Sequence, residues 1–393
     1  MPISPRVAAI LSYVAVFGAV GAWYPYLAVF YKERGLDLGT IGFLTALGAA
    51  AGLVSAPIWG AVADRFAGSR LIIPIGALVT AVGAAGIALV DGVLAIAVAL
   101  VVASIAFAGI APILDARALE TVGSDRNRYG RLRAWGSGAF IVVVAFTGAI
   151  VERTGITSMF VVYVAALLVL AVVSLPLRGD DAAPRLPRLD AIAVVLRHPP
   201  LARFLPAVLL VWSASMAINW YFSIHLLDLG APGELVGSAW AIGALVEIPI
   251  MAAYPWLAAR VGSERLLVIG AAVFALRAIV LSLVNDPILA AGTMALHGVA
   301  FALVLVGGVT FVSRHAPEAT AATAQGILSA TIFSVAMIVG PGVGSFVAGQ
   351  FGVPALFTLA WTTSTVAIPV CWLAVHRPQP ERALAAPEAP RYP

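Results

Sequence analysis

Five ionisable side chains interrupt long apolar stretches of this sequence: Asp115, Arg133, Glu247, Arg277 and His297. A charged side chain at the centre of a membrane helix costs at least about 2.5 to 3.5 kcal/mol on insertion scales, so each of these residues is a candidate functional residue. The acids can exchange a proton and the arginines can hold an anion. This combination favours the movement of ions over the breaking of bonds.

Three of these residues are expected at a similar depth. Glu247 lies 11 residues into its apolar stretch, His297 lies 9 residues into its own, and Arg277 lies 8 residues from the end of the stretch between them. At about 1.5 Å per residue, these depths are about 12 to 17 Å, near the middle of a hydrocarbon core about 30 Å thick. Arg277 cannot lose its proton, so it needs an anion, either Glu247 or a carboxylate of a bound molecule. We expect Glu247 to exchange the proton with His297 and Arg277 as neighbours, although a neutral His297 bonded between helices is an alternative.

A second charged pair is predicted in the first half of the chain. Asp115 lies at the end of one apolar stretch and Arg133 at the start of the next, so antiparallel helices bring them to one depth. Arg131 is two residues away and does not share the face of Arg133 on a helix. We therefore choose Arg133 as the partner of Asp115, either in a central cavity or as an ion pair that only joins two helices.

Aromatic and amide side chains add candidates for the wall of a cavity. They are Trp23, Tyr24, Tyr26, Asn219 and Tyr221. Tryptophan and tyrosine are also enriched where a membrane helix meets water, so part of this group is explained by the interface. Asn219 is not explained in that way.

The composition excludes several classes of protein. The chain has 62% hydrophobic and 11% charged residues with a mean hydropathy of +1.02, whereas soluble domains carry roughly 25% charged residues. The single cysteine, Cys371, leaves no disulfide framework, and we expect no metal or cofactor because no zinc motif, phosphate loop or nucleophile elbow is found. The basic residues are scattered singly, so the net charge of +4 does not indicate a nucleic-acid partner. We expect no enzyme, because no nucleophile lies beside a base and no histidine pair has ligand spacing.

The elements that position these residues are twelve apolar segments, each long enough to cross a bilayer. They lie near residues 8–31, 40–63, 71–90, 93–118, 131–151, 156–177, 203–227, 236–259, 266–285, 288–313, 320–349 and 353–375. The longest polar stretch separates the sixth segment from the seventh. We therefore predict an all-α membrane protein with a six-helix bundle at 1–177, a cytoplasmic linker at 178–202, a second six-helix bundle at 203–376 and a cytoplasmic tail at 377–393.

The basic residues also predict the orientation. With the amino terminus in the cytoplasm, only Lys32, Arg34 and Arg153 of the 23 lysines and arginines fall outside, two lie within spans and 18 are cytoplasmic. This bias is the positive-inside signal and predicts that both termini are cytoplasmic.

The two halves resemble each other, and the first of them carries a family signature. WGAVADRFAGSRLIIPIG after the second segment and YPWLAARVGSERLLVIG after the eighth share an aromatic residue, a basic residue, a glycine and an arginine, as in a parallel repeat. GAVADRFAGSR resembles the loop signature of the major facilitator superfamily, with Ser69 where a second basic residue is common. The resemblance implies that this gating loop latches the halves during rocking, through Gly60, Asp64, Arg65, Gly68 and Arg70.

A longer stretch is similar to one branch of that superfamily. PILDARALETVGSDRNRYGRLRAWGSGAF resembles the phenylpropionate permease and lactose permease branch, and YFSIHLLDLG, ALVEIPIM, AVFALR and MALHGVAF repeat its pattern in the second half. The resemblance places Glu247, Arg277 and His297 on charged cavity positions. Lactose permease carries acids where this chain has Ala244 and Ala300, so the proton carrier implied at Ala300 is absent and Glu247 is the replacement.

These observations predict a secondary transporter of the major facilitator fold in a bacterial cytoplasmic membrane. We expect a proton-coupled symporter of a small organic anion such as an aromatic carboxylate, powered by the proton gradient and working as a monomer. Glu247, His297 and Arg277 would couple the proton, while Asp115 would compete with the substrate for Arg133. A sugar or nucleoside transporter is the first alternative, and an exporter of drugs or metabolites is the second.

Overall fold

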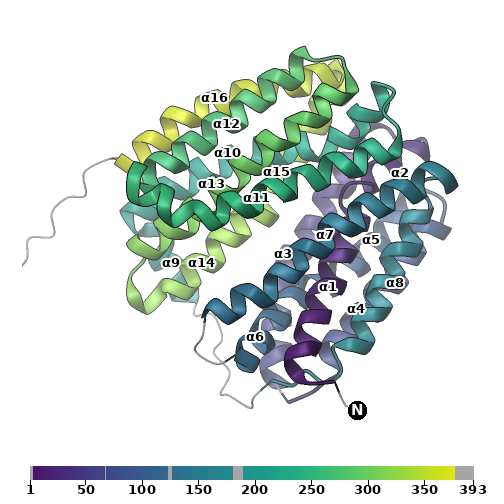
Figure 1. The fold of residues 1–393 in the computed structure, drawn as a ribbon, viewed down its shortest axis with the longest axis vertical. Coiled ribbons are helices and arrows are strands. Elements are labelled where there is room, and N and C mark those ends of the chain that lie inside the picture. Colours follow the sequence, from purple (N-terminus) through teal and green to yellow (C-terminus); the bar gives the residue numbers. More distant parts are fainter. Residues whose placement is uncertain (1–2, 67, 123–125, 180–188, 377–393) are drawn as a thin grey trace, which may run out of the picture.

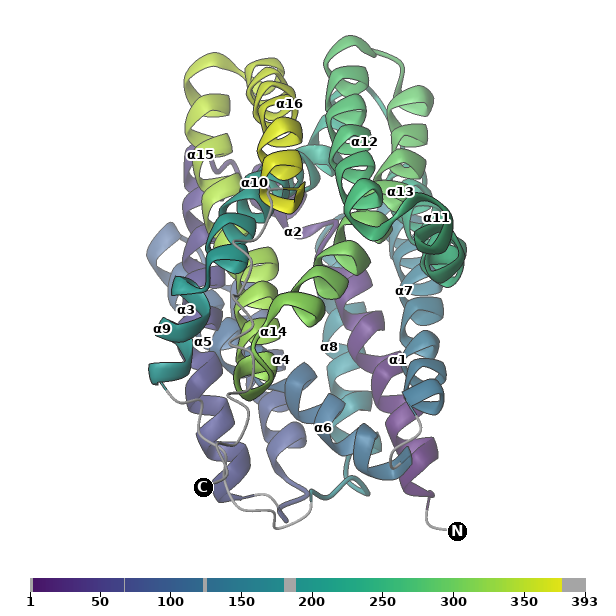
Figure 2. The same cartoon turned by 90° about the vertical axis from the view of Figure 1, so that its left-hand side faces the viewer.

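The computed structural model describes residues 3–66, 68–122, 126–179 and 189–376 as helices joined by short connections, arranged in two bundles (Figures 1 and 2). The amino-terminal half contains α1 (Pro5–Trp23), α2 (Leu27–Glu33), α3 (Leu38–Arg65), α4 (Ile72–Leu89), α5 (Val93–Ala108), α6 (Ile110–Val122), α7 (Arg126–Thr154) and α8 (Ser158–Val173). The short helix α9 (Leu189–Arg197) follows. The carboxyl-terminal half contains α10 (Pro199–Asp228), α11 (Gly233–Val261), α12 (Ser263–Leu283), α13 (Pro287–His315), η1 (Glu318–Thr320), α14 (Ala321–Ala330), η2 (Thr331–Val335), α15 (Ala336–Phe351) and α16 (Val353–His376).

The predicted all-helical architecture is confirmed. Among the described residues, eleven helical segments are long and apolar enough to cross a membrane, and α8 supplies a shorter apolar helix of 16 residues. The predicted linker contains α9, whereas residues 180–188 and the predicted tail at 377–393 lie outside the described residues.

Two of the predicted spans are each interrupted between two α-helices, whereas the eleventh runs without a break from α14 through η2 to α15. The first is interrupted between Trp23 and Leu27, around Pro25, which has no backbone N–H to donate and whose ring excludes a regular turn. The fourth is interrupted at Gly109, where the ring of Trp59 occupies the space that a Cβ atom would need. The first interruption leaves Tyr24, Pro25 and Tyr26 between the end of α1 at Trp23 and the start of α2.

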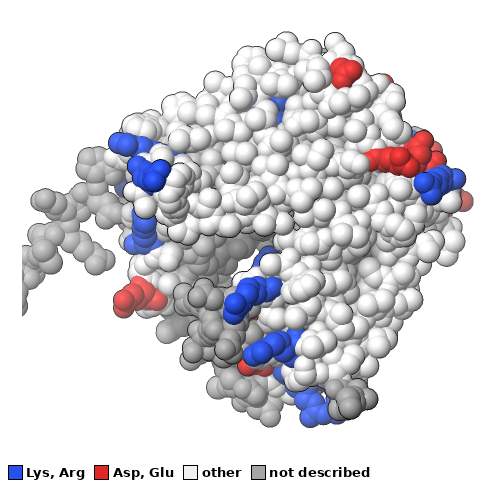
Figure 3. Space-filling model, in the orientation of Figure 1, with Lys and Arg blue, Asp and Glu red and all other residues white. Residues whose placement is uncertain are grey.

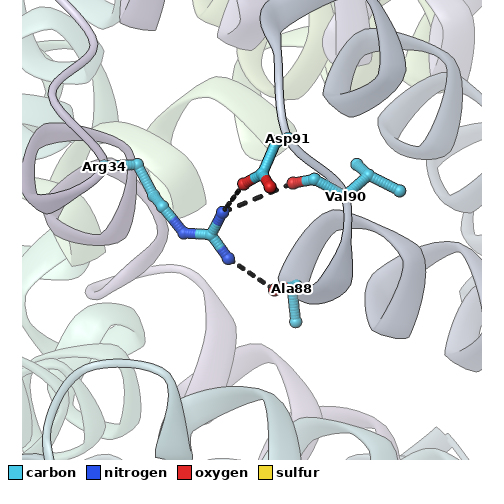
Figure 4. A network of polar contacts seen from close by, with 4 residues as sticks. All are labelled: Arg34, Ala88, Val90 and Asp91. Atoms are coloured by element: carbon cyan, nitrogen blue, oxygen red, sulfur yellow. Dashed lines mark hydrogen bonds and ion pairs between the residues drawn. The ribbon is translucent and has the colours of Figure 1, made fainter.

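Arg34 fixes the end of the short helix α2 (Figure 4). Its Nη1 donates to Asp91 Oδ1 at 2.8 Å and to the Val90 carbonyl at 3.4 Å, and its Nη2 donates to the Ala88 carbonyl at 2.6 Å. The last carbonyls of a helix have no partner within the helix, and a cation at that end satisfies them. Arg34 therefore joins α2 to the end of α4.

Replacing Arg34 by glutamine is expected to lower the thermal unfolding midpoint of the purified protein by several degrees. The Ala88 carbonyl loses a charged donor at 2.6 Å, and such a hydrogen bond contributes about 1.5 kcal/mol, whereas the longer contact with the Val90 carbonyl contributes less. Asp91→Asn is the matched control, because the Asp91 side chain is 95% exposed and its ion pair should contribute little. Equal midpoints for Arg34→Gln and Asp91→Asn would show that the carbonyl contacts do not stabilise the fold.

The two halves meet on one side of the molecule, which we call the closed face. It is defined by contacts between the amino-terminal and carboxyl-terminal halves through Lys32, Glu152, Arg153, Asp228, Gly233 and Glu234. There α3 packs on α15 and α7 packs on α11, and a Cβ atom added to Gly237 of α11 would lie 2.7 Å from the Val144 carbonyl of α7. Glycine at such a position lets two membrane helices approach closely.

The opposite side of the molecule, which we call the linker face, is hollowed. The helix α3 begins at the closed face, where its Leu38 carbonyl accepts a hydrogen bond from Tyr221, and after 28 residues it ends at the linker face. Figure 3 shows a hollow between the two halves that opens on the side of α9 and α14, with lysine and arginine side chains at its edge. The structure is thus closed at one end and open at the other.

Asp37 caps the start of α3 at the closed face. Its carboxylate accepts hydrogen bonds from the hydroxyl and the amide of Thr40, and these bonds lower the pKa of the Asp37 carboxyl. Because the folded-state pKa lies below the unfolded value, the cap stabilises the protein at neutral pH. That contribution is lost as the pH falls through the folded-state pKa.

Glu152 supplies the cap of a helix in the other half. The first helical amides of α11 have no partner within the helix, Pro232 offers no side-chain cap, and the Glu152 carboxylate of α7 accepts the Gly233 amide instead. We expect Glu152→Ala to shift the protein toward opening of the closed face by about tenfold, since a charge-assisted hydrogen bond contributes about 1.5 kcal/mol.

The shift can be measured as the distance distribution between spin labels at Glu33 and Asn285, which are exposed in opposite halves. The labelling background is Cys371→Ser, because Cys371 is the single cysteine of the chain. Glu234→Gln is the control, because its contact with Arg153 is 3.9 Å long and both side chains are largely exposed. If Glu152→Ala leaves the distances of the parent unchanged, Glu152 does not hold this face closed.

Candidate functional site

Arg277 of α12 is the most deeply buried charge that the structure describes, with 0% exposure. Its Nη1 donates to Asn219 Oδ1 of α10 at 2.7 Å, and the same nitrogen lies 3.3 Å from His297 Nδ1 of α13. Its Nη2 lies 3.2 Å from the sulfur of Met294, and its guanidinium lies 5.2 Å from the ring centre of Phe222. Three helices therefore converge on one guanidinium.

None of the partners of Arg277 among the described residues is an anion. Its contacts are an amide, an imidazole, a thioether and an aromatic ring, and its Nε has no hydrogen-bond partner. An isolated charge in a low-dielectric interior is costly unless it is paired. The site can therefore stabilise an anion that enters it.

His297 adopts a defined protonation state beside this charge. Arginine only donates hydrogen bonds, so the close approach of Arg277 Nη1 requires His297 Nδ1 to be the acceptor. The imidazole is then neutral and carries its hydrogen on Nε2. The rings of Trp240, Phe274 and Phe301 surround it, with centroid distances of 6.4, 5.8 and 5.6 Å.

Glu247 lies in α11 beside the same helix α13. The two helices are in close contact at their glycines. A Cβ atom built on Gly243 would lie 3.7 Å from the His297 ring, and one built on Gly298 would lie 3.2 Å from the Glu247 amide nitrogen. The side chain is partly buried, and within the described part of the chain its carboxylate has no hydrogen bond or ion pair. The Glu247–Arg277 pair that the sequence left open is not formed in this conformation, in which Arg277 binds Asn219 and His297 instead.

The amino-terminal half brings Asp115 and Arg133 together as an ion pair. Arg133 Nη1 lies 3.3 Å from Asp115 Oδ1, and the Tyr13 hydroxyl donates to the same oxygen at 2.6 Å. The Arg133 guanidinium also lies 5.2 Å from the ring centre of Phe17. The two charged side chains are 46% and 34% exposed, so water reaches this pair, unlike Arg277.

The aromatic candidates divide into two groups. Trp23 and Tyr24 lie at the interruption of the first span, where Tyr24 packs edge-on against Trp220 and Trp240 of the other half. Tyr26 and Tyr221 are buried in helix contacts, where Tyr26 donates to the Val144 carbonyl and Tyr221 donates to the Leu38 carbonyl. In this conformation the second group closes the molecule rather than lining a cavity.

The residues of the predicted gating loop lie at the linker face. Gly60, Arg65, Gly68 and Arg70 are exposed, the Arg65 guanidinium lies 6.0 Å from the Phe66 ring, and the Asp64 side chain is outside the described set. No described contact joins these residues to the carboxyl-terminal half.

Sequence reasoning missed Arg117, which is 3% exposed. Its Nη1 donates to the Leu177 carbonyl at 3.0 Å and its Nη2 to the Ser69 carbonyl at 2.7 Å. It therefore ties the gating loop to the chain that leaves α8. The sequence contained one indication of its burial. Arg117 follows Asp115 by two residues and therefore lies within the helix rather than in the loop.

Comparisons with known proteins agree with this architecture. The model of the MFS_1 like family matches residues 9–359. The maltose permease of Geobacillus stearothermophilus is 30% identical over 346 residues, covering 86% of this chain and 84% of that protein. The probable 3-phenylpropionic acid transporter of Escherichia coli (strain K12) is 26% identical and covers 66% of this chain and 70% of that protein. The crystal structure of nucleoside transporter NupG superposes with a TM-score of 0.81 at 18% identity, over 96% of this chain and 100% of that chain.

Proposed function

Because the chain belongs to the MFS_1 like family of major facilitator transporters, we propose that it is a proton-coupled symporter of a small organic anion, with an aromatic carboxylate as the substrate class. Membership makes it a multi-pass secondary transporter of a small molecule, and not an enzyme. The observation that supports the anion is the guanidinium of Arg277, which is fully buried and bound only by neutral groups among the described residues.

The arrangement of charges supports coupling to a proton. In the carboxyl-terminal half, Arg277 contributes one positive charge and Glu247 contributes one negative charge when it is ionised. The charges sum to zero when the site is empty, and again when an anion and a proton are bound together. A state with only one of the two ligands carries a net charge, which is costly to enclose in the membrane interior. Movement between the two orientations is thereby favoured only for the empty and the fully loaded protein.

This conformation corresponds to one of the two end states of the transport cycle. The closed face is sealed by helix contacts and the linker face is hollowed, as alternating access requires of a carrier that opens to one side. The bias of basic residues assigns the linker face to the cytoplasm. We infer that this conformation releases substrate inward, and that separation of Glu152 from α11 accompanies the outward-open state. In the amino-terminal half, Asp115 holds Arg133 until a substrate competes for it.

A neutral sugar is the second candidate, because the similarity to maltose permease extends over most of both chains. A sugar would leave the buried charge of Arg277 uncompensated, and this is the physical reason for placing the anion first. Binding of phenylacetate and of phenylacetamide to the purified protein separates the two candidates. A ligand that binds only the folded state raises the free energy of unfolding by RT ln(1 + [L]/Kd), which is about 2.7 kcal/mol at a hundredfold excess over Kd, and the unfolding midpoint rises with it.

We expect stabilisation by the carboxylate, little by the amide and none by maltose or uridine. Addition of phenylacetate to proteoliposomes should also produce proton uptake, which a dye inside the vesicles detects. Equal stabilisation by acid and amide, or stabilisation by maltose alone, would contradict the proposed substrate class.

A further inference from the structure

A second, half-open cavity of about 160 Å³ lies in the amino-terminal half, between α1, α5 and α8. Its walls are Val20, Trp23, Tyr24, Ala103, Ser104, Phe107 and Tyr163. None of these residues is ionisable at neutral pH, and four are aromatic. The cavity is distinct from the Arg277 cluster, which is built from α10, α12 and α13 of the other half.

We propose that this cavity is the subsite that binds the ring of a monocyclic aromatic carboxylate, while the carboxylate is held at Arg277. The inference rests on the proposed function, because it assigns a place to the uncharged part of the same substrate.

The aromatic walls of the cavity are held in place by their neighbours. The rings of Trp23 and Tyr163 lie 4.4 Å apart at an angle of 30°, and the Trp23 ring meets the edge of Phe160 at 5.8 Å. Aromatic surfaces favour a planar ring, which packs against them in offset or edge-on geometry. The shape of the wall therefore selects a flat apolar group.

The volume selects a single ring. An engineered protein cavity of about 150 Å³ binds benzene. The cavity described here, at about 160 Å³, has room for one six-membered ring.

Three lining residues carry polar atoms that define the chemistry further. No described hydrogen bond is made by the side chains of Trp23, Ser104 or Tyr163, Tyr163 is only 4% exposed, and the Ser104 hydroxyl lies beside Gly48 of α3 at the edge of the cavity. A sugar ring would bring several hydroxyl groups, and each one left unpaired is costly in a buried site. A phenyl ring brings none, and a hydroxyphenyl ring brings one, which Ser104 or Tyr163 can bind.

Tyr24 links the cavity to the charged cluster. It lines the cavity, its ring packs edge-on against Trp240 at 5.3 Å, and the Trp240 ring in turn lies 6.4 Å from the ring of His297, which contacts Arg277. Tyr24 and Trp240 therefore lie between the cavity and the Arg277 cluster. A turn of these two side chains would join the ring subsite to the guanidinium.

The test uses the full-length protein, with binding of phenylacetate, 4-hydroxyphenylacetate and butyrate as probes. Val20→Phe fills the cavity, so we expect it to weaken the binding of phenylacetate at least tenfold. The affinity for butyrate, which has no ring, should change by less than threefold. Tyr163→Phe and Ser104→Ala remove polar atoms without changing the shape of the wall. At least one of these two variants should weaken the binding of 4-hydroxyphenylacetate about tenfold and leave the affinity for phenylacetate within twofold of the parent.

Tyr31→Phe is the matched control, because the Tyr31 hydroxyl is also buried without a partner among the described residues but lies outside this cavity. If the parent protein binds the carboxylates and all three cavity variants bind every probe as the parent does, the ring subsite is refuted and the proposed function stands. If the parent binds none of the carboxylates, the proposed function fails and this inference fails with it. If methyl glucoside competes with phenylacetate for binding to the parent protein and Val20→Phe abolishes this competition, the cavity binds a sugar ring and the aromatic assignment is overturned.

Discussion

Replacing Arg277 by methionine is expected to weaken binding of an aromatic carboxylate at least about 100-fold, while binding of its amide changes by less than about threefold. A buried charge that pairs with a ligand contributes about 2 to 5 kcal/mol, and 100-fold corresponds to about 2.7 kcal/mol. Methionine keeps much of the apolar volume of arginine and removes the cation together with its hydrogen bonds to Asn219 and His297. Transport of radiolabelled phenylacetate and its binding to purified protein should fall together.

Arg277→Lys provides a control that keeps the charge. Lysine offers a point charge without the planar fork of donors, so it cannot hold Asn219 and His297 in the same geometry. We expect intermediate affinity from this variant. If Arg277→Met binds acid and amide as the parent does, Arg277 does not contact the carboxylate and is a structural residue that joins α10, α12 and α13.

Replacing Glu247 by glutamine is expected to abolish accumulation driven by a proton gradient while exchange of substrate across the membrane continues. Glutamine imitates the protonated carboxyl, so the protein with bound anion still carries no net charge in the carboxyl-terminal half. The empty variant carries the uncompensated charge of Arg277, so its return to the outward-open orientation is slow. Counterflow of labelled substrate in proteoliposomes should therefore persist when uptake driven by an imposed pH difference is lost.

Glu234→Gln is the matched control for this experiment, because Glu234 is an exposed acid at the start of the same helix. It should retain driven uptake. Undiminished accumulation by Glu247→Gln would remove Glu247 from the coupling mechanism, and loss of both activities would indicate a structural role.

Hydropathy was sufficient to predict the helices, because about 20 consecutive apolar residues have few stable alternatives in a bilayer. The interruption at Pro25 and the one at Gly109 were not predicted. A helix in a membrane can accommodate a proline or glycine when its neighbours satisfy the freed backbone groups, and the sequence does not show those neighbours. At Gly109 the neighbour is Trp59 of another span.

The site was predicted in its residue types and only partly in its contacts. The cost of burying a charge identified Arg277, but its partners lie on two other helices and depend on how these pack. Asn219 was noticed as an unusual polar residue, without any indication that it would face Arg277. Ser104 and Tyr163 were not noticed at all, because a serine and a tyrosine are common in membrane helices and only the packing of three helices turns them toward one cavity.

The opposite charges of Arg277 and Glu247 have an electrical consequence. Moving one elementary charge across a potential of 100 mV changes the free energy by about 2.3 kcal/mol. If the protein crosses between its two orientations only when these charges are compensated, no net charge moves in either direction. Uptake should then follow the pH difference and ignore a voltage imposed with valinomycin and potassium, and a cell that is depolarised at constant internal pH would lose none of its capacity to import the substrate.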